Sequence, residues 1–198
     1  MAHTHQEFEL PNGDRGVLRE PRADRDLERL AMFFSALPEA RRNYLRYNVT
    51  DVEMLRSRLG QLDGTDHWRL IAEVGGEIVG DATLDREPYG WTRHVAQIRG
   101  VVSPDFDDAD VGSVLYTELV HIGDAAGIEV LYTEVMPQQR EVIAILGKAG
   151  FERSAILRKF AKDLKGRPQD LHVYTNDLSL VWQRLAEHLE MMDIRISG

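Results

Sequence analysis

The middle of this chain alternates strand-like with helix-like segments, and this alternation limits the folds open to it more than any other feature. His94–Val102 and Val130–Val135 are short, mainly apolar runs bounded by turn signals, which is typical of buried strands. Asp110–Ala126 and a stretch from about Gln138 to Lys148 place apolar residues at helical spacing. Strands that alternate with helices in this way predict a sheet with helices packed on its faces.

Hairpins flank this central unit on both sides. Trp68–Val74 and Glu77–Asp85 are predicted strands around the turn Gly75-Gly76, and Phe151–Leu164 with Asp170–Asn176 forms a last hairpin. We therefore predict the fold class α/β (α+β), with a mixed central sheet of about seven strands and helices on both faces. The remaining predicted elements are a strand at Gly16–Glu20 and helices within residues 24–34 and 38–59.

We expect one folded domain with short additions at each end. A chain of 198 residues with 43% hydrophobic content suits a single core. The predicted division is an N-terminal extension at residues 1–15, the domain at 16–178 and a C-terminal helical tail at 179–198. The tail either packs on its own domain or forms a homodimer interface, because it carries an apolar stripe. The stripe consists of Leu178, Val181, Trp182, Leu185, Leu189 and Met192.

The composition excludes several kinds of protein. The chain has no cysteine, which rules out disulfides, thiolate metal sites and a cysteine nucleophile. Its formal charge of -9 disfavours a general nucleic-acid binder and suits amine-bearing substrates better. No run approaches the about 20 apolar residues of a membrane helix, so we expect a cytoplasmic protein that does not bind membranes. His3 and His5 lack a defined third ligand, and we assign no metal.

Four short motifs, taken in order, carry a family resemblance. They are Val101-Val102-Ser103-Pro104, Val111-Gly112-Ser113-Val114-Leu115, Ala149-Gly150-Phe151 and the closing Asn176-Asp177-Leu178. In this order and spacing, the chain from about Gly16 to Leu178 resembles the GNAT (N-acetyltransferase) superfamily. The stretch from Glu134 to Arg140 looks most like the bacterial protein-lysine acetyltransferase branch.

The resemblance implies a site for acetyl-CoA or another acyl-CoA between two splayed parallel strands. Main-chain groups of Val101 and Val102 would hold the pantetheine arm, and an amine would attack the thioester directly. The CoA pyrophosphate would rest on main-chain N–H groups at a helix N-terminus. The implied loop and helix residues are Ala109, Asp110, Val111, Gly112, Ser113 and Val114, with Gln139 at the position of a usual asparagine.

The phosphate loop departs from the family pattern. Asp107 stands where a basic or amide residue is usual, and Asp110 stands where glycine is usual. Together with Asp108, these carboxylates should oppose a pyrophosphate. Aspartates at a helix start can also cap the free N–H groups that a ligand would otherwise take. Two readings stay open: the acidic loop replaces the phosphate, or the main-chain cradle survives with weaker affinity.

The candidate catalytic groups also depart from the pattern. Gln97 occupies the position of a frequent glutamate base, and Leu146 that of a usual tyrosine acid. Glu134 remains as the candidate base, the alternative being an ordinary strand glutamate. Two functions follow as hypotheses. The chain is an N-acyltransferase acting on a small-molecule amine or a protein lysine, or it is a catalytically degenerate domain with a ligand-binding, regulatory or scaffolding role.

Overall fold

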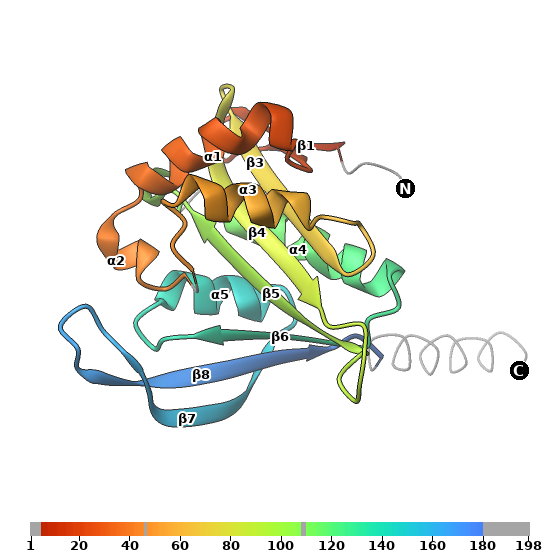
Figure 1. Cartoon of the computed structure of the whole chain (residues 1–198), viewed down its shortest axis with the longest axis vertical. Helices are drawn as coiled ribbons and strands as arrows, with labels where there is room; N and C mark the ends of the chain where they lie inside the picture. Colours follow the sequence, from red (N-terminus) through yellow and green to blue (C-terminus); the bar gives the residue numbers. More distant parts are fainter. Residues whose placement is uncertain (1–4, 46, 108–109, 180–198) are drawn as a thin grey trace, which may run out of the picture.

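The computed structural model describes residues 5–45, 47–107 and 110–179. Eight strands form one sheet in the order β1-β2-β3-β4-β5-β6-β8-β7, in which only β5 and β6 pair in parallel (Figure 1). The strands are β1 (His5–Glu9), β2 (Arg15–Arg19), β3 (His67–Val74), β4 (Glu77–Arg86), β5 (Val95–Val102), β6 (Val130–Val135), β7 (Glu152–Lys162) and β8 (Pro168–Asp177). The described helices are α1 (Ala23–Ala36), α2 (Glu39–Arg42), α3 (Val52–Gly60), α4 (Val111–Ala125) and α5 (Arg140–Lys148), with one 3-10 turn at Pro104–Phe106.

The predicted mixed sheet with helices on both faces is confirmed, with eight strands where about seven were expected. The strand that was missed is β1, which lies in the segment expected to be an extension before the domain. It pairs with β2 in antiparallel register, from His5 opposite Arg19 to Glu9 opposite Arg15. The ring of Phe8 lies over Gly16, where an added Cβ would come within 2.2 Å of the ring. Local sequence did not reveal this strand because its pairing partner supplies most of its contacts.

Alternate side chains of the central strands enter two separate hydrophobic clusters, one on each face of the sheet. Ile98 and Val102 of β5 pack in the cluster that contains residues of α4 and α5. Val101 packs in the other cluster, with residues of α1 and α3. Figure 1 shows α1 and α3 crossing one face of β3 and β4, with α4 on the opposite face. The period of two along each strand therefore fills both layers.

A buried ion-pair network fastens α1 to the sheet. The carboxylate of Asp26, which is fully buried, accepts hydrogen bonds from Arg19 at 2.7 Å and from Arg29 at 2.7 Å. Both arginines also pair with Glu73 of β3. Burial alone would raise the pKa of Asp26, but the bonds from Arg19 and from the backbone of Arg22 outweigh it and hold the pKa below its usual range.

The sheet opens between β5 and β6, and this opening positions the site. The two strands pair only from Val95 to Gln97, opposite Val130 to Tyr132. Beyond Gln97, β5 stays paired with β4 up to Val102, while β6 stays paired with β8. The strands therefore separate at their carboxyl ends, as the family resemblance implied.

Of the predicted tail at residues 179–198, all but Ser179 lies outside the described part of the chain, and so does the homodimer interface assigned to it. Leu178, the first residue of the predicted apolar stripe, is described and is buried in the core of the domain. Among the described helices, none combines the length and the apolar character that a membrane crossing requires.

Candidate functional site

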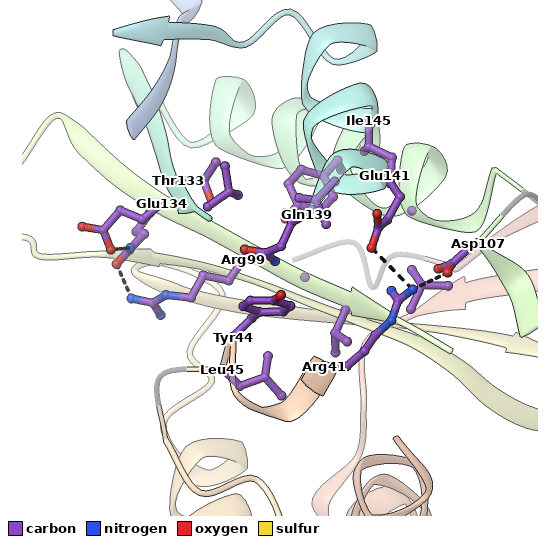
Figure 2. Close-up of a pocket in the computed structure, with 18 residues that line it drawn as sticks. Arg41, Tyr44, Leu45, Arg99, Asp107, Thr133, Glu134, Gln139, Glu141 and Ile145 are labelled. Atoms are coloured by element: carbon purple, nitrogen blue, oxygen red, sulfur yellow. Dashed lines mark hydrogen bonds and ion pairs between the residues drawn. The ribbon is translucent and has the colours of Figure 1, made fainter. Parts of the chain in front are cut away.

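A cavity lies where β5 and β6 separate (Figure 2). It holds about 840 Å³ of space, including the part open to solvent. Its walls come from the ends of both strands, from α2 and the two residues after Asn43, and from α4 and α5. The lining residues are Arg41, Tyr44, Leu45, Gln97, Arg99, Gly100, Val101, Val102, Asp107, Gly112, Tyr116, Thr133, Glu134, Val135, Gln139, Glu141, Val142 and Ile145.

The structure brings five of the expected site residues to this cavity. They are Val101, Val102, Gly112, Glu134 and Gln139. Asp110, Val111, Ser113 and Val114 lie at the start of α4 but do not line the cavity, and Ala109 lies outside the described residues.

Asp110 does not cap α4 with its side chain, so the capping role that the sequence left open does not apply to this residue. Asp110 takes the left-handed conformation, with φ 57° and ψ 8°, and makes no side-chain hydrogen bond to the N–H groups of the helix start. Its carboxylate instead accepts a bond of 2.9 Å from Lys148 Nζ, and this bond lowers the pKa of Asp110. The same carboxylate oxygen also accepts a 3.4 Å bond from Ser113 Oγ, so its partners are side chains of α4 and α5 and not the helix N–H groups.

Gly112 allows α4 and α5 to approach closely. A Cβ at this position would lie 2.5 Å from Ile145 Cδ1 and 3.5 Å from Val102 Cγ2. The missing side chain is therefore explained by helix packing at the cavity wall, and a ligand is not needed to account for it.

Arg41 closes one side of the cavity. It forms an ion pair with Asp107, and its guanidinium lies 3.6 Å from a carboxylate oxygen of Glu141 (Figure 2). These residues come from α2, from the loop before α4 and from α5. Two negative charges beside the cavity are thus paired with one arginine, which reduces the repulsion that an anionic ligand would meet there.

Gln97 and Glu134 are linked across the opening of the sheet. Gln97 Nε2 donates to Glu134 Oε2 at 3.4 Å, and Gln97 Oε1 accepts a bond from Arg99 (Figure 2). Arg99 Nη1 also lies 3.3 Å from Asp85 Oδ2. The other carboxylate oxygen of Asp85 is in hydrogen-bond contact with His67 Nδ1 at 3.1 Å. A cation on one side and a carboxylate on the other fix the orientation of the Gln97 amide. The side chain that replaces the frequent glutamate base therefore holds Glu134 in place.

Besides Glu134, the polar side chains that line the cavity include two tyrosines and Gln139. Leu146 is fully buried in the core and does not reach the cavity. Tyr116 does line it, and burial raises the pKa of Tyr116 well above the ordinary value, so its hydroxyl stays protonated. Tyr44 lines the opposite wall. Gln139 Oε1 accepts a 2.8 Å bond from the Met136 N–H, so its amide braces the turn before α5.

Sequence reasoning did not single out most of the polar wall residues. Arg41 and Tyr44 lie in the segment 38–59, for which the sequence predicted helices. Arg99, Thr133 and Glu141 gave no signal, because they belong to elements that meet only in the folded chain. Within the described residues, no group of three or more His, Cys, Asp or Glu is placed to hold a metal ion.

Comparison with known proteins agrees with the fold. The family model "Acetyltransferase (GNAT) family" matches residues 30–151. Comparison with curated protein sequences gave no significant match.

Several solved structures share the fold. The GNAT domain of S. lividans PAT superposes with a TM-score of 0.72 at 23% identity, covering 90% of this chain and 99% of that one. Ribosomal-protein-alanine N-acetyltransferase from Brucella melitensis gives 0.70 at 23% identity, covering 81% and 99%. The protein yncA from Salmonella typhimurium, solved with its cofactor acetyl-CoA, gives 0.72 at 16% identity, covering 82% and 94%.

Proposed function

Because this chain belongs to the GNAT acetyltransferase family, we propose that it transfers an acetyl group from acetyl-CoA to an amine of a small molecule or a protein. The observation that carries the proposal is the separation of β5 and β6 after Gln97, which opens the cavity described above. The walls of this cavity supply main-chain groups at the end of β5, Gly112 from the first turn of α4, and three carboxylates. Asp107 and Glu141 lie beside Arg41, whereas Glu134 lies beside the amide of Gln97. A carboxylate beside a cavity of this kind suits an amine that must lose a proton before it attacks.

The main chain suits the long, mixed surface of CoA. Past Gln97, the edge of β5 that faces β6 has no ladder partner in that strand, so main-chain groups of Val101 and Val102 can bind the pantetheine arm. The start of α4, at Val111 to Ser113, would receive the pyrophosphate, because helix N-termini favour anions. The side chain of Asp110 does not take these N–H groups. This favours the surviving main-chain cradle over an internal substitute for phosphate.

The acidic loop should nevertheless weaken CoA binding. Asp107 and Asp110 remain close to the start of α4, although Arg41 and Lys148 pair with them. Ion pairs at exposed positions cancel a charge only in part. We therefore expect a lower CoA affinity than a basic or glycine-rich loop would give.

In the proposed reaction, acetyl-CoA supplies an activated acetyl group. The amine nitrogen forms a bond to the acetyl carbon, the C–S bond breaks, and the attacking ammonium must lose its proton. Glu134 accepts that proton, and Gln97 holds the carboxylate toward the cavity. The thiol of CoA can leave as a thiolate and take its proton from solvent. Tyr116, whose pKa is raised, is a poor proton donor for this step.

The test is the rate of acetyl transfer by Glu134→Gln. Free CoA can be followed with a thiol reagent without background, because the chain has no cysteine. We expect turnover to fall by about 100-fold or more, as for loss of a general base. Acetyl-CoA affinity, measured by calorimetry, should stay nearly unchanged. Glu129→Gln, an exposed glutamate just before β6, is the matched control and should keep its rate. An unaffected rate in Glu134→Gln would remove this residue from the mechanism.

A second candidate function is favoured by the lost family groups. Gln97 cannot act as a base, and Leu146 lies in the core where the resemblance places a tyrosine acid. In this alternative, the domain binds a ligand or partner without catalysing transfer. Acetyl-CoA binding without CoA release for any amine in a broad acceptor screen would favour it.

A further inference from the structure

A second groove adjoins the cavity on the side of the β7–β8 hairpin, and we name it the acceptor groove. It holds about 610 Å³ of space, including the part open to solvent. The groove and the cavity share Tyr44, Leu45, Glu134 and Gln139, so Glu134 borders both. The remaining lining residues are Asn43, Met136, Phe160, Ala161 and Leu171.

An irregularity in β7 directs the hairpin toward this groove. Leu157 pairs with Leu171 and Ala161 with Gln169, so three residues of β7 lie opposite the single residue Asp170. Lys159, inside this bulge, has φ 54°, and its N–H donates to Asp170 Oδ1 at 2.9 Å. A left-handed lysine costs free energy, and bulges are found where a strand must redirect a side chain. The bulge brings Phe160 and Ala161 to the groove wall.

Phe160 gives the groove an apolar contact surface. Phe160 lines the groove, and yet 67% of its surface is exposed to solvent. A large aromatic side chain left in solvent beside a pocket is a frequent anchor for a binding partner. A partner long enough to fill the groove beside Glu134 would also contact Phe160 on the hairpin.

The strand that carries Phe160 is basic, in contrast to the chain as a whole. Of the eleven residues of β7, the basic ones are Arg153, Arg158, Lys159 and Lys162, and the single acidic one is Glu152. The three basic residues nearest Phe160 are exposed. Within the described part of the chain their side chains form no ion pair, and the nearest carboxylate in the bulge, Asp170, accepts its bond from the Lys159 main chain. The whole chain has a formal charge of -9. A positive surface beside the groove of an acidic protein selects for negative charge on what binds there.

We propose that the acceptor is an acidic polypeptide segment. Its lysine or N-terminal amine enters the acceptor groove toward Glu134, and its Asp and Glu residues pair with Arg158, Lys159 and Lys162. This inference rests on the proposed acetyl transfer and names its substrate class. A small amine would use Glu134 but would gain nothing from the basic strand. A nucleic acid would meet the acidic remainder of the surface.

The experiment compares peptide pools that differ only in the charge around one lysine. Each pool has a free N-terminus and a central lysine, with flanks drawn from Asp, Glu, Gly and Ser, from Gln, Gly and Ser, or from Arg, Gly and Ser. CoA release gives the rate, and mass spectrometry locates the acetyl group. We expect kcat/KM for the acidic pool to exceed that for the neutral pool by about tenfold, as a few exposed charge pairs would give. The preference should shrink in about 0.5 M salt, where surface charges are screened.

Variants separate the basic strand from a general charge effect. Arg158→Glu with Lys162→Glu should abolish the preference for the acidic pool or reverse it. Arg153→Glu makes the same kind of change at the far end of β7 and is the control, which should keep the preference. Phe160→Ala should raise KM for all peptide pools several-fold. Melting temperatures of all variants check that the hairpin still folds.

The outcomes distinguish this inference from the proposed function. Equal rates for all three pools, or equal rates for peptides and for a free diamine, would refute the acidic-segment proposal and leave acetyl transfer intact. If no pool is acetylated, acetyl transfer to peptides fails, and docking is still tested by fluorescence anisotropy of a labelled acidic pool in the presence of CoA. Binding that is lost in the Arg158→Glu, Lys162→Glu variant would support the surface, and binding that is unchanged would refute it.

Discussion

Removing the charge of Asp110 should strengthen CoA binding by a predictable amount. The carboxylate lies at the start of α4, where the pyrophosphate is proposed to bind, and its side chain is 56% exposed. Two phosphate charges at about 7 Å, in a medium with an effective dielectric constant of about 40 to 80, would be repelled by about 1 to 2 kcal/mol. Asp110→Asn should therefore bind CoA about five- to thirtyfold more tightly. The variant also removes the carboxylate that pairs with Lys148, so the charge of Lys148 becomes available to the phosphates.

A second variant separates charge from backbone conformation. Asn tolerates the left-handed φ of 57° about as well as Asp does, whereas Gly adopts it without strain. Asp110→Gly should match the CoA affinity of Asp110→Asn and gain about 1 kcal/mol of stability, less a few tenths for the lost pair with Lys148. For a chain of this size, that gain corresponds to a melting temperature about 2 °C higher.

The assay is calorimetric titration with CoA at low and moderate salt. The affinity gain should be larger at low salt, because the repulsion acts between exposed charges. Asp24→Asn, an exposed aspartate on α1, is the control and should leave the affinity unchanged. An affinity of Asp110→Asn within a factor of about two of the parent chain would refute the repulsion and the placement of phosphate at this helix.

Three further perturbations test the packing and electrostatics around the site. Gly112→Ala should lower the free energy of unfolding by about 1 to 2 kcal/mol, because the added Cβ would lie 2.5 Å from Ile145. Gly147→Ala, on the open surface of α5, is the control and should raise it by about 0.5 kcal/mol. Chemical denaturation measures both changes. Lys148→Ala should leave Asp110 uncompensated and weaken CoA binding several-fold in calorimetry. Asp26→Asn should cost about 3 kcal/mol at neutral pH, since it leaves two arginines without their buried partner. The pKa of Asp26 is lowered in the folded state, so its contribution to stability is full above about pH 4 and is lost as the pH falls below that value. The difference in unfolding free energy between the parent chain and Asp26→Asn should therefore be smaller at pH 3 than at neutral pH.

The elements with strong periodicity could be predicted from the sequence. The strand at Val130–Val135 has the predicted bounds, and the Gly75-Gly76 turn joins β3 and β4 as expected. Both have apolar patterns and turn residues that act over a few positions. Strand β1 was missed, because its pairing with β2 and the contact of Phe8 with Gly16 are tertiary.

The sequence predicted the main-chain features of the candidate site, but it did not predict the side-chain pairs between residues that are far apart in the chain. The separation of β5 and β6 was predicted from a family resemblance, which rests on motifs such as Val101–Pro104. The contact of Arg41 with Asp107 joins residues far apart in the sequence, and no local pattern indicates it. The sequence left two readings open for the acidic loop, and it could not decide between them because the pairing of Asp110 with Lys148 is formed only in the folded chain.

The most direct test of the central claim is calorimetric titration of acetyl-CoA into the purified protein, followed by CoA release when an amine is added. The proposed function predicts micromolar binding and release of CoA that depends on the amine. Absence of binding at millimolar acetyl-CoA would contradict it.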